Sequence, residues 1–232
     1  MLPEPDIAAV ATLIGEPARA IILSALLSGK ALPASELASR AHVTPQTASS
    51  HLAKLLAGDL ISVTVMGRYR YYALKNSEVA QALEALQVIA PAAKNTPSRR
   101  PKIAPELCHA RTCYDHLAGK LGVALSNGLI AKGYLLKVEQ HYELTAKGAT
   151  LAESWGIDVG LLKKKRRRFA YACLDWSERR FHVAGALGAA IAAAFFAKGW
   201  VKHLPDTRAL KVTDAGVDML QRDFGIALSD VM

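Results

Sequence analysis

Cysteine is scarce in this sequence, and its three cysteines form no C-x-x-C pair. Three thiols are too few for a disulfide framework or for a site built of thiolates alone, so each is expected to be a free thiol or a single ligand. A basic opening segment is also missing, because residues 1–12 contain acids but no lysine or arginine. We therefore expect no secretory signal and a cytoplasmic location.

Long apolar runs are missing as well. The run from Val183 to Ala197 has about fifteen residues and is rich in alanine, whereas a membrane-spanning helix needs about twenty apolar residues. This run predicts a buried helix and no membrane partner.

Acidic residues are outnumbered, since 29 lysines and arginines against 20 aspartates and glutamates give a net charge of +9. Residues 1–90 hold seven charges of each sign, so residues 91–232 carry the whole excess. The total charge fits a nucleic-acid partner and ordinary solubility equally well. The length of 232 residues and the hydrophobic share of 51% favour two domains.

The segment from Thr44 to Leu56 predicts a helix with a polar face that has no carboxylates. Thr44 can accept hydrogen bonds from the first amides, and proline at position 45 suits the first helical position. The apolar face holds Ala48, Leu52, Leu55 and Leu56. The polar face holds Gln46, Thr47, Ser50 and Lys54. Short hydrogen-bonding side chains without acids suit the anionic surface of a DNA duplex.

A second short helix is predicted just before this one, over residues 34–41, with His42 and Val43 as a tight connection. Two helices joined so closely indicate a helix-turn-helix motif. Residues 63–74 form two β-prone runs about Gly67, which predicts a hairpin, or wing. Further helices are expected over residues 7–14, 17–27 and 77–90.

Residues 13–86 resemble the winged helix-turn-helix of ArsR-type transcriptional regulators. The resemblance is carried by G-E-P-A-R (15–19), E-L-A (36–38), T-A-S-S-H-L (47–52) and G-R-Y-R-Y-Y (67–72). It implies a homodimer that pairs its first and fifth helices and binds a two-fold site on double-stranded DNA. The candidate DNA-binding residues are Thr44, Gln46, Thr47, Ser50, His51, Lys54, Arg68, Tyr69 and Arg70.

Within this set the resemblance assigns base contacts to Gln46, Thr47, Ser50 and His51, and phosphate contacts to the wing arginines. Relatives often carry Gln or His where this chain has Ser50, and Pro45 replaces a polar residue, so no operator sequence carries over. The metal ligands that are usual in the family are missing from this sequence, because residues 36–42 contain no cysteine and residues 77–90 contain no histidine. No metal and no cofactor are therefore expected.

The predicted organisation is a DNA-binding and dimerisation domain (1–90), a linker (91–105) and a duplicated sensing domain (106–232). Four prolines and four basic residues mark the linker. Beyond it, His116 to Gly133 aligns without a gap with His182 to Gly199, with nine of eighteen positions identical. Each copy is followed by two β-prone runs, Thr-x-x-Gly and a helix, giving repeats of about 113–158 and 173–228. The fold class is thus mainly α with small β-hairpins: a winged helix, then an α+β domain of two winged-helix-like repeats.

Chemically active side chains gather before each repeated helix, and both groups contain Cys-x-Asp and a histidine expected to open the helix. The candidate sensing residues are Cys108, Cys113, Asp115, His116, Cys173, Asp175 and His182. Three interpretations remain open. In the first, these residues have structural roles: the aspartates cap helices or pair with Arg111, Arg179 or Arg180, and the cysteines are simply buried. In the second they form a small-molecule or thiol redox sensor, and in the third, which is less favoured, a metal sensor. The glycines at 119, 122, 185 and 188 allow close helix packing or a pocket between the helices.

Six consecutive basic residues, 163–168, lie between the repeats. They are either a solvated loop or an additional contact to the DNA backbone.

Together these patterns predict a sequence-specific DNA-binding regulator, a repressor if the resemblance holds, that responds to a small-molecule or redox effector. A rival hypothesis is a thiol enzyme using Cys113 or Cys173 with His116 or His182 as base. The absence of an oxyanion loop or cofactor fingerprint near the thiols argues against it. A protein-binding winged helix is a third possibility.

Overall fold

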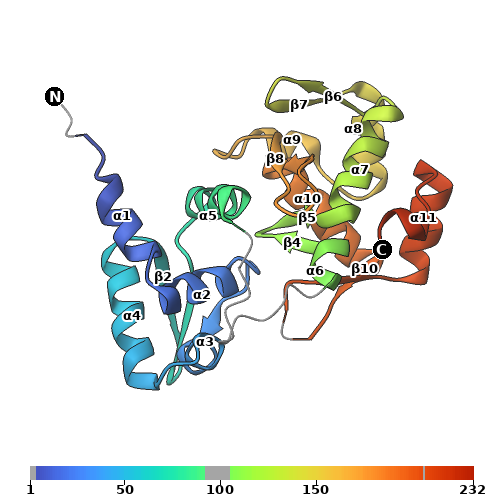
Figure 1. Ribbon diagram of the computed structural model, residues 1–232. Coiled ribbons are helices and arrows are strands. Elements are labelled where there is room, and N and C mark those ends of the chain that lie inside the picture. Colours follow the sequence, from blue (N-terminus) through green and yellow to red (C-terminus); the bar gives the residue numbers. More distant parts are fainter. Residues whose placement is uncertain (1–3, 92–104, 206) are drawn as a thin grey trace. The chain divides into compact units, whose positions relative to one another are not determined.

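The computed structural model describes residues 4–91, 105–205 and 207–232, which form two compact units, Met1–Glu84 and Ala85–Met232 (Figure 1). Residues 92–104, which make up most of the predicted linker, lie outside the described residues. The division between the units falls within a helix rather than at residue 90.

The first unit is a winged helix-turn-helix, as predicted. Its helices are α1 (Ile7–Ile14), α2 (Pro17–Leu26), α3 (Ala34–Ala41), α4 (Pro45–Ala57) and the greater part of α5 (Ser77–Ile89), of which residues 85–89 belong to the second unit. Its strands are β1 (Leu32–Pro33), β2 (Ile61–Met66) and β3 (Tyr69–Leu74), in the antiparallel order β1-β3-β2. The short strand β1 was not predicted. It pairs with β3 through Leu32 and Tyr72 and so extends the wing into a sheet.

The G-E-P-A-R motif closes the corner between α1 and α2. Glu16 caps α2, accepting hydrogen bonds from the amides of Ala18 (3.1 Å) and Arg19 (2.8 Å). The buried Arg19 donates back to the carbonyls of Leu13 (2.6 Å) and Thr12 (2.7 Å) at the end of α1. Because one motif satisfies both a helix start and a helix end, it fixes the bend between the two helices.

The second unit contains two copies of one order of elements: helix, hairpin, helix, hairpin, helix. The first copy consists of α6 (Pro105–His109), β4 (Arg111–Cys113), β5 (His116–Ala118), α7 (Gly119–Ala131), β6 (Leu135–Val138), β7 (His141–Leu144) and α8 (Ala146–Ser154). The second consists of α9 (Val159–Lys163), β8 (Tyr171–Leu174), β9 (Phe181–Ala184), α10 (Gly185–Ala197), β10 (Val201–His203), β11 (Leu210–Val212) and α11 (Asp214–Phe224). A short 3-10 helix, η1 (Leu228–Asp230), follows.

The repeated helices begin three residues later than predicted. His116 and His182 do not open helices; each lies in a strand that leads into one. The change of direction requires glycine, because Gly119 has φ +74° and Gly185 φ +85°, in the left-handed region. A Cβ at Gly119 would also lie 2.6 Å from the carbonyl oxygen of Cys108. The glycines therefore permit a sharp strand-to-helix turn.

The two repeats exchange hairpins. Hairpin β6-β7 of the first repeat joins β8-β9 of the second in one four-stranded sheet, through the pair His141 and Tyr171. Hairpin β10-β11 in turn lies beside β4-β5, through a bridge between Arg111 and Ala209. Helix α7 packs against β9, and α10 against β5. Neither repeat is therefore a separate domain, because each supplies part of the other's sheet.

The Thr-x-x-Gly motif has the same role in both repeats. Thr145 and Thr213 cap α8 and α11, each accepting a hydrogen bond from the amide of the glycine three residues later. A Cβ on either glycine would lie 2.1 Å from a carbonyl oxygen at the start of the preceding hairpin. Threonine starts the helix, and glycine lets it lie directly on the strand.

The core of the second unit is apolar and closely packed. Trp155 makes edge contacts with Phe195, Trp200 and Phe224 at centroid distances of 5.7–6.2 Å. Among the described residues, no single helix is both long and apolar enough to cross a membrane. The bent pair α1 and α2, at 90° to each other, meets that test together by length and composition only.

Candidate functional site

Helix α4 presents the polar face that the sequence predicted. Thr44 caps it, accepting a hydrogen bond from the amide of Thr47 (3.2 Å), and Pro45 occupies its first turn. Ala48, Leu52 and Leu55 are at most 1% exposed. The side chains on the opposite face are exposed, and we call them the α4 strip: Gln46, Thr47, Ser50 and Lys54. Leu56, expected in the core, is half-buried.

His51 borders the α4 strip but is largely buried. Its side chain is 14% exposed, and its Nδ1 atom lies 3.5 Å from Oε2 of Glu16. Burial works to raise the pKa of the Glu16 carboxyl, but the two capped amides and His51 hold that pKa below its usual value. This geometry ties α4 to the corner between α1 and α2. A base contact by His51 stays a prediction.

The wing exposes the three predicted contact residues at its tip. Gly67, with φ +59°, forms the turn, and Met66 pairs with Tyr69 across it. Arg68 donates a hydrogen bond to the Tyr69 hydroxyl (3.0 Å) and lies over its ring. Arg70 is exposed on β3. The tip thus offers two guanidinium groups, the chemistry that phosphate contacts need.

In the second unit, each repeat presents one cysteine and one histidine as cross-strand neighbours. Cys113 pairs with His116 across β4-β5, and Cys173 with His182 across β8-β9. Paired residues of an antiparallel hairpin project from the same face. Because the hairpins interlock, the two pairs meet, and we call these four side chains the Cys/His cluster.

The donor atoms of the Cys/His cluster are close together and largely buried. The two sulfur atoms are 3.9 Å apart, and the two Nε2 atoms 3.1 Å. All four donor atoms lie within 4.8 Å of one another. The histidines and Cys113 are buried, and Cys173 is half-buried.

A carboxylate faces the second nitrogen of each histidine. Nδ1 of His116 lies 3.3 Å from Oδ1 of Asp115, and Nδ1 of His182 lies 3.3 Å from Oδ2 of Asp175. Both predicted aspartates thus stand behind the histidines, outside the group of four donors. This arrangement orients both imidazoles so that their Nε2 atoms point at each other.

Asp175 also joins the two repeats. Its carboxylate forms a fully buried ion pair with Arg111 (2.9 Å) and accepts a hydrogen bond from the amide of Gly119 (2.7 Å), both in the first repeat. It also accepts hydrogen bonds from the amides of Ser177 and Glu178. Burial works to raise the pKa of Asp175, but His182 and Arg111 hold it well below its usual range. Of the partners considered for Asp175 from the sequence, Arg111 is the one that forms an ion pair with it.

Asp115 is held by a residue that sequence reasoning did not connect with it. Arg167, within the basic run 163–168, donates to its carboxylate at 2.6 Å. Burial opposes ionisation here too, but His116 and Arg167 keep the pKa of Asp115 below its usual value. Part of the basic run therefore belongs to the surroundings of the Cys/His cluster.

The cluster concentrates negative charge around a buried imidazole. Burial alone would lower the pKa of His116, but the Cys113 thiolate and Asp115 outweigh it and raise that pKa to about 10. Burial, assisted by the Cys173 thiolate, also raises the pKa of Tyr142 to about 12. Such surroundings attract a cation, either a proton or a metal ion. Cys108, in α6, is half-buried and is not among the four donors.

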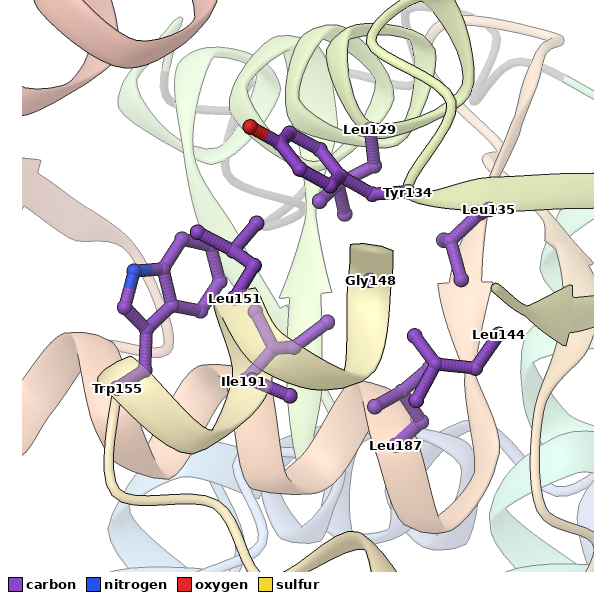
Figure 2. A pocket seen from close by; sticks show the side chains of 10 residues that line it. Leu129, Tyr134, Leu135, Leu144, Gly148, Leu151, Trp155, Leu187 and Ile191 are labelled. Carbon is purple, nitrogen blue, oxygen red and sulfur yellow. The ribbon is translucent and has the colours of Figure 1, made fainter. Parts of the chain in front are cut away.

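The pocket expected between the paired helices has almost no room. The space between α7 and α10 is lined by Gly122, Ser126 and Gly188 among others, and holds about 10 Å³. A second cavity of about 10 Å³ lies beside α8, where Trp155, Leu151 and Ile191 converge (Figure 2). Organic ligands usually need at least about 300 Å³, whereas about 10 Å³ admits a single water. These two cavities are too small for an organic effector.

The chain is similar to several known proteins. Residues 14–64 match the family model described as a helix-turn-helix domain. The cadmium metal-sensor CMTR from Mycobacterium tuberculosis is 31% identical over 41% of this chain and 100% of its own, with a TM-score of 0.33. The possible ArsR-family regulator Mb0332 from Mycobacterium bovis is 25% identical over 38% of this chain and 89% of its own, with a TM-score of 0.34.

One curated relative spans both units. It is the "Uncharacterized HTH-type transcriptional regulator YdfF" of Bacillus subtilis, 43% identical over 224 residues, which are 97% of this chain and 99% of the relative. The predicted winged helix-turn-helix regulator with a C-terminal extension is thereby confirmed. The chain belongs to the family of DNA-binding, helix-turn-helix transcriptional regulators.

Proposed function

We propose that this regulator is a homodimeric repressor whose affinity for a two-fold operator changes with a signal received in its C-terminal unit. The observation that carries the DNA-binding part is the exposed, acid-free α4 strip beside a wing tip with two arginines. A strip of this kind suits the donor and acceptor pattern of a major groove. Repression itself is what the ArsR-type resemblance implies.

Exposed apolar residues on two helices support the homodimer. None of the eight residues of α1, all of them described, is buried, and Ile7 is 79% exposed. Near the end of α5, Leu86 is 40% and Ile89 76% exposed. Large apolar side chains left exposed on a helix can mark an interface. A second copy of the chain would cover them and present the α4 strip twice.

The Cys/His cluster is the place we propose for the signal. It joins side chains from both repeats, and an ion-paired arginine links it to the basic run. A change in its charge or bonding would therefore act on both repeats at once. The two apolar cavities are too small for an organic effector, whereas an open polar depression of about 440 Å³, lined by Lys120, Glu178 and Arg180 among others, has the volume for one.

A band-shift assay tests the DNA-binding part. The full chain should bind a duplex taken from the DNA upstream of its own gene, and replacing Gln46 and Ser50 with alanine should weaken specific binding by at least about tenfold, since a good base contact contributes about 1–3 kcal/mol. Arg222→Ala serves as a control, because Arg222 is exposed on α11 and pairs with Asp223. Equal binding by the double variant and the control would refute the proposed interface.

A further inference from the structure

We infer that the Cys/His cluster is a four-coordinate binding site for a divalent metal ion of the zinc type. This site lies in the C-terminal unit, outside the helix positions at which the resemblance places a metal, at residues for which a metal was the least favoured interpretation of the sequence. It deepens the proposed sensing function, on which its regulatory meaning rests. Metal binding itself is a separate property and is measured without DNA.

The donor distances fit a tetrahedron. Zinc bonds of about 2.3 Å to sulfur and about 2.0 Å to nitrogen place two sulfur atoms about 3.8 Å apart and two nitrogen atoms about 3.3 Å apart. The corresponding distances here are 3.9 Å and 3.1 Å. All donor pairs lie within 4.8 Å, so one ion can reach all four atoms with small side-chain movements.

The orientation of the histidines is a second, independent argument. In its neutral form each imidazole, with Nδ1 facing a carboxylate, carries its proton on that nitrogen and turns the Nε2 lone pair into the cluster. The two Nε2 atoms lie 3.1 Å apart in a buried site. In the metal-free chain a proton holds this place, and a metal ion would take it by displacing that proton. A carboxylate behind a metal-bound histidine is the usual arrangement in zinc sites.

The chemistry of the donors selects the class of ion. Two thiolates and two neutral imidazoles carry a charge of −2, which a divalent ion neutralises. Sulfur and imidazole nitrogen favour zinc over magnesium or calcium, which prefer oxygen ligands. The donors come equally from the two repeats, so the ion would cross-link them. All four positions are protein ligands, which is typical of a closed, non-catalytic site.

The test uses the full-length chain, reduced and freed of metal by a chelator. We expect it to bind one equivalent of Zn²⁺ in competition with a chromophoric chelator. Co²⁺ as a probe should give the visible bands of a tetrahedral ion and a thiolate charge-transfer band. Cys173→Ser and His182→Gln should weaken Zn²⁺ binding by more than about 100-fold. Cys108→Ser and His141→Gln, which alter the same residue types outside the cluster, should bind as the unmodified chain does.

Circular dichroism identifies any variant that fails to fold, and Cys173→Ser is the more tolerant choice because Cys173 is half-buried. Alkylation gives a second measurement: bound Zn²⁺ should protect Cys113 and Cys173 but leave Cys108 reactive. The inference is overturned if the folded chain binds no Zn²⁺, or if Cys173→Ser binds it equally well. A metal-free chain that instead forms a Cys113–Cys173 disulfide in air would replace it with a redox site. Tight metal binding that leaves operator affinity unchanged would refute the sensing function and keep the site.

Discussion

The two repeats of the C-terminal unit supply the same donors but hold them in different ways. Each gives one cysteine and one histidine, and each places an aspartate behind the histidine. Asp175 is fully buried and paired with the equally buried Arg111, whereas Asp115 is 28% exposed and paired with Arg167, which is 27% exposed. The second repeat therefore provides a rigid half of the cluster, and the first an adjustable half connected to the basic run.

The largest expected effect comes from breaking the rigid half. Arg111→Ala should lower the free energy of unfolding by about 3–5 kcal/mol, because it leaves the Asp175 carboxylate buried without its counter-ion. Arg167→Ala removes a partly exposed pair and should cost less than about 1 kcal/mol. Urea unfolding followed by tryptophan fluorescence measures this, since all three tryptophans, 155, 176 and 200, lie in the C-terminal unit. Similar losses for the two variants would contradict the difference between the halves.

Gly122 and Gly188 occupy equivalent positions in the two repeats, and replacing them tests whether the repeats pack in the same way. A Cβ on Gly122 would lie 2.4 Å from the carbonyl oxygen of Leu117, and one on Gly188 would lie 2.5 Å from that of Val183. Each alanine variant should therefore lose about 1–3 kcal/mol in the same unfolding experiment, as overpacked sites do. Gly160→Ala is the control, because its nearest atom is a side-chain oxygen of Asp158 at 3.3 Å. Markedly unequal losses would show that the two turns are not equivalent.

The carboxylates behind the histidines should differ in their effect on metal binding. Asp175→Asn and Asp115→Asn keep the side-chain shape but remove the charge that favours the Nε2 lone pair. Loss of such a group typically weakens metal binding by about 10–100-fold. We expect the larger loss for the buried Asp175. Competition with a chromophoric chelator measures both affinities, and a larger loss for Asp115→Asn would reverse the assignment of the halves.

Local sequence signals predicted the first unit well. The bounds of α1 and α3 agree with the predicted ranges, and α4 begins at the predicted Thr44 cap and Pro45. Caps and helical periodicity act over a few residues, so the sequence displays them directly. Strand β1 was missed because two residues are too few to show a strand pattern.

The grouping of the Cys/His cluster could not be predicted in the same way. The strands β4, β5, β8 and β9 have three or four residues each, and the predicted helices were extended back to His116 and His182 over two of them. The repeat was visible, but the exchange of hairpins between repeats depends on tertiary packing. Without it, Cys113 and Cys173 are two isolated thiols sixty residues apart. The expectation that no metal binds came from the usual positions of the family, which lie before the linker, and from the lack of a C-x-x-C pair and the presence of only three cysteines beyond it.

The smallest expected effect concerns the basic run 163–168, which lies between the repeats. Arg167 already pairs with Asp115, and Arg168 lies over the Tyr171 ring, whereas residues 163–166 are exposed. Replacing those four with glutamine should flatten the plot of log affinity against log salt by about 0.9 for each phosphate that the run no longer neutralises.

Alanine at the wing residues Arg68 and Arg70 gives the reference slope for that experiment, and Arg167→Gln is the matched control. Because the Arg167 charge is engaged at the cluster, its removal should leave the slope nearly unchanged while altering the response to metal. An unchanged slope after neutralising residues 163–166 would assign the run to solvent. If Arg167→Gln flattens the salt dependence as much as the change at residues 163–166 does, Arg167 must leave Asp115 when DNA binds. The adjustable half of the cluster would then link metal binding to DNA binding.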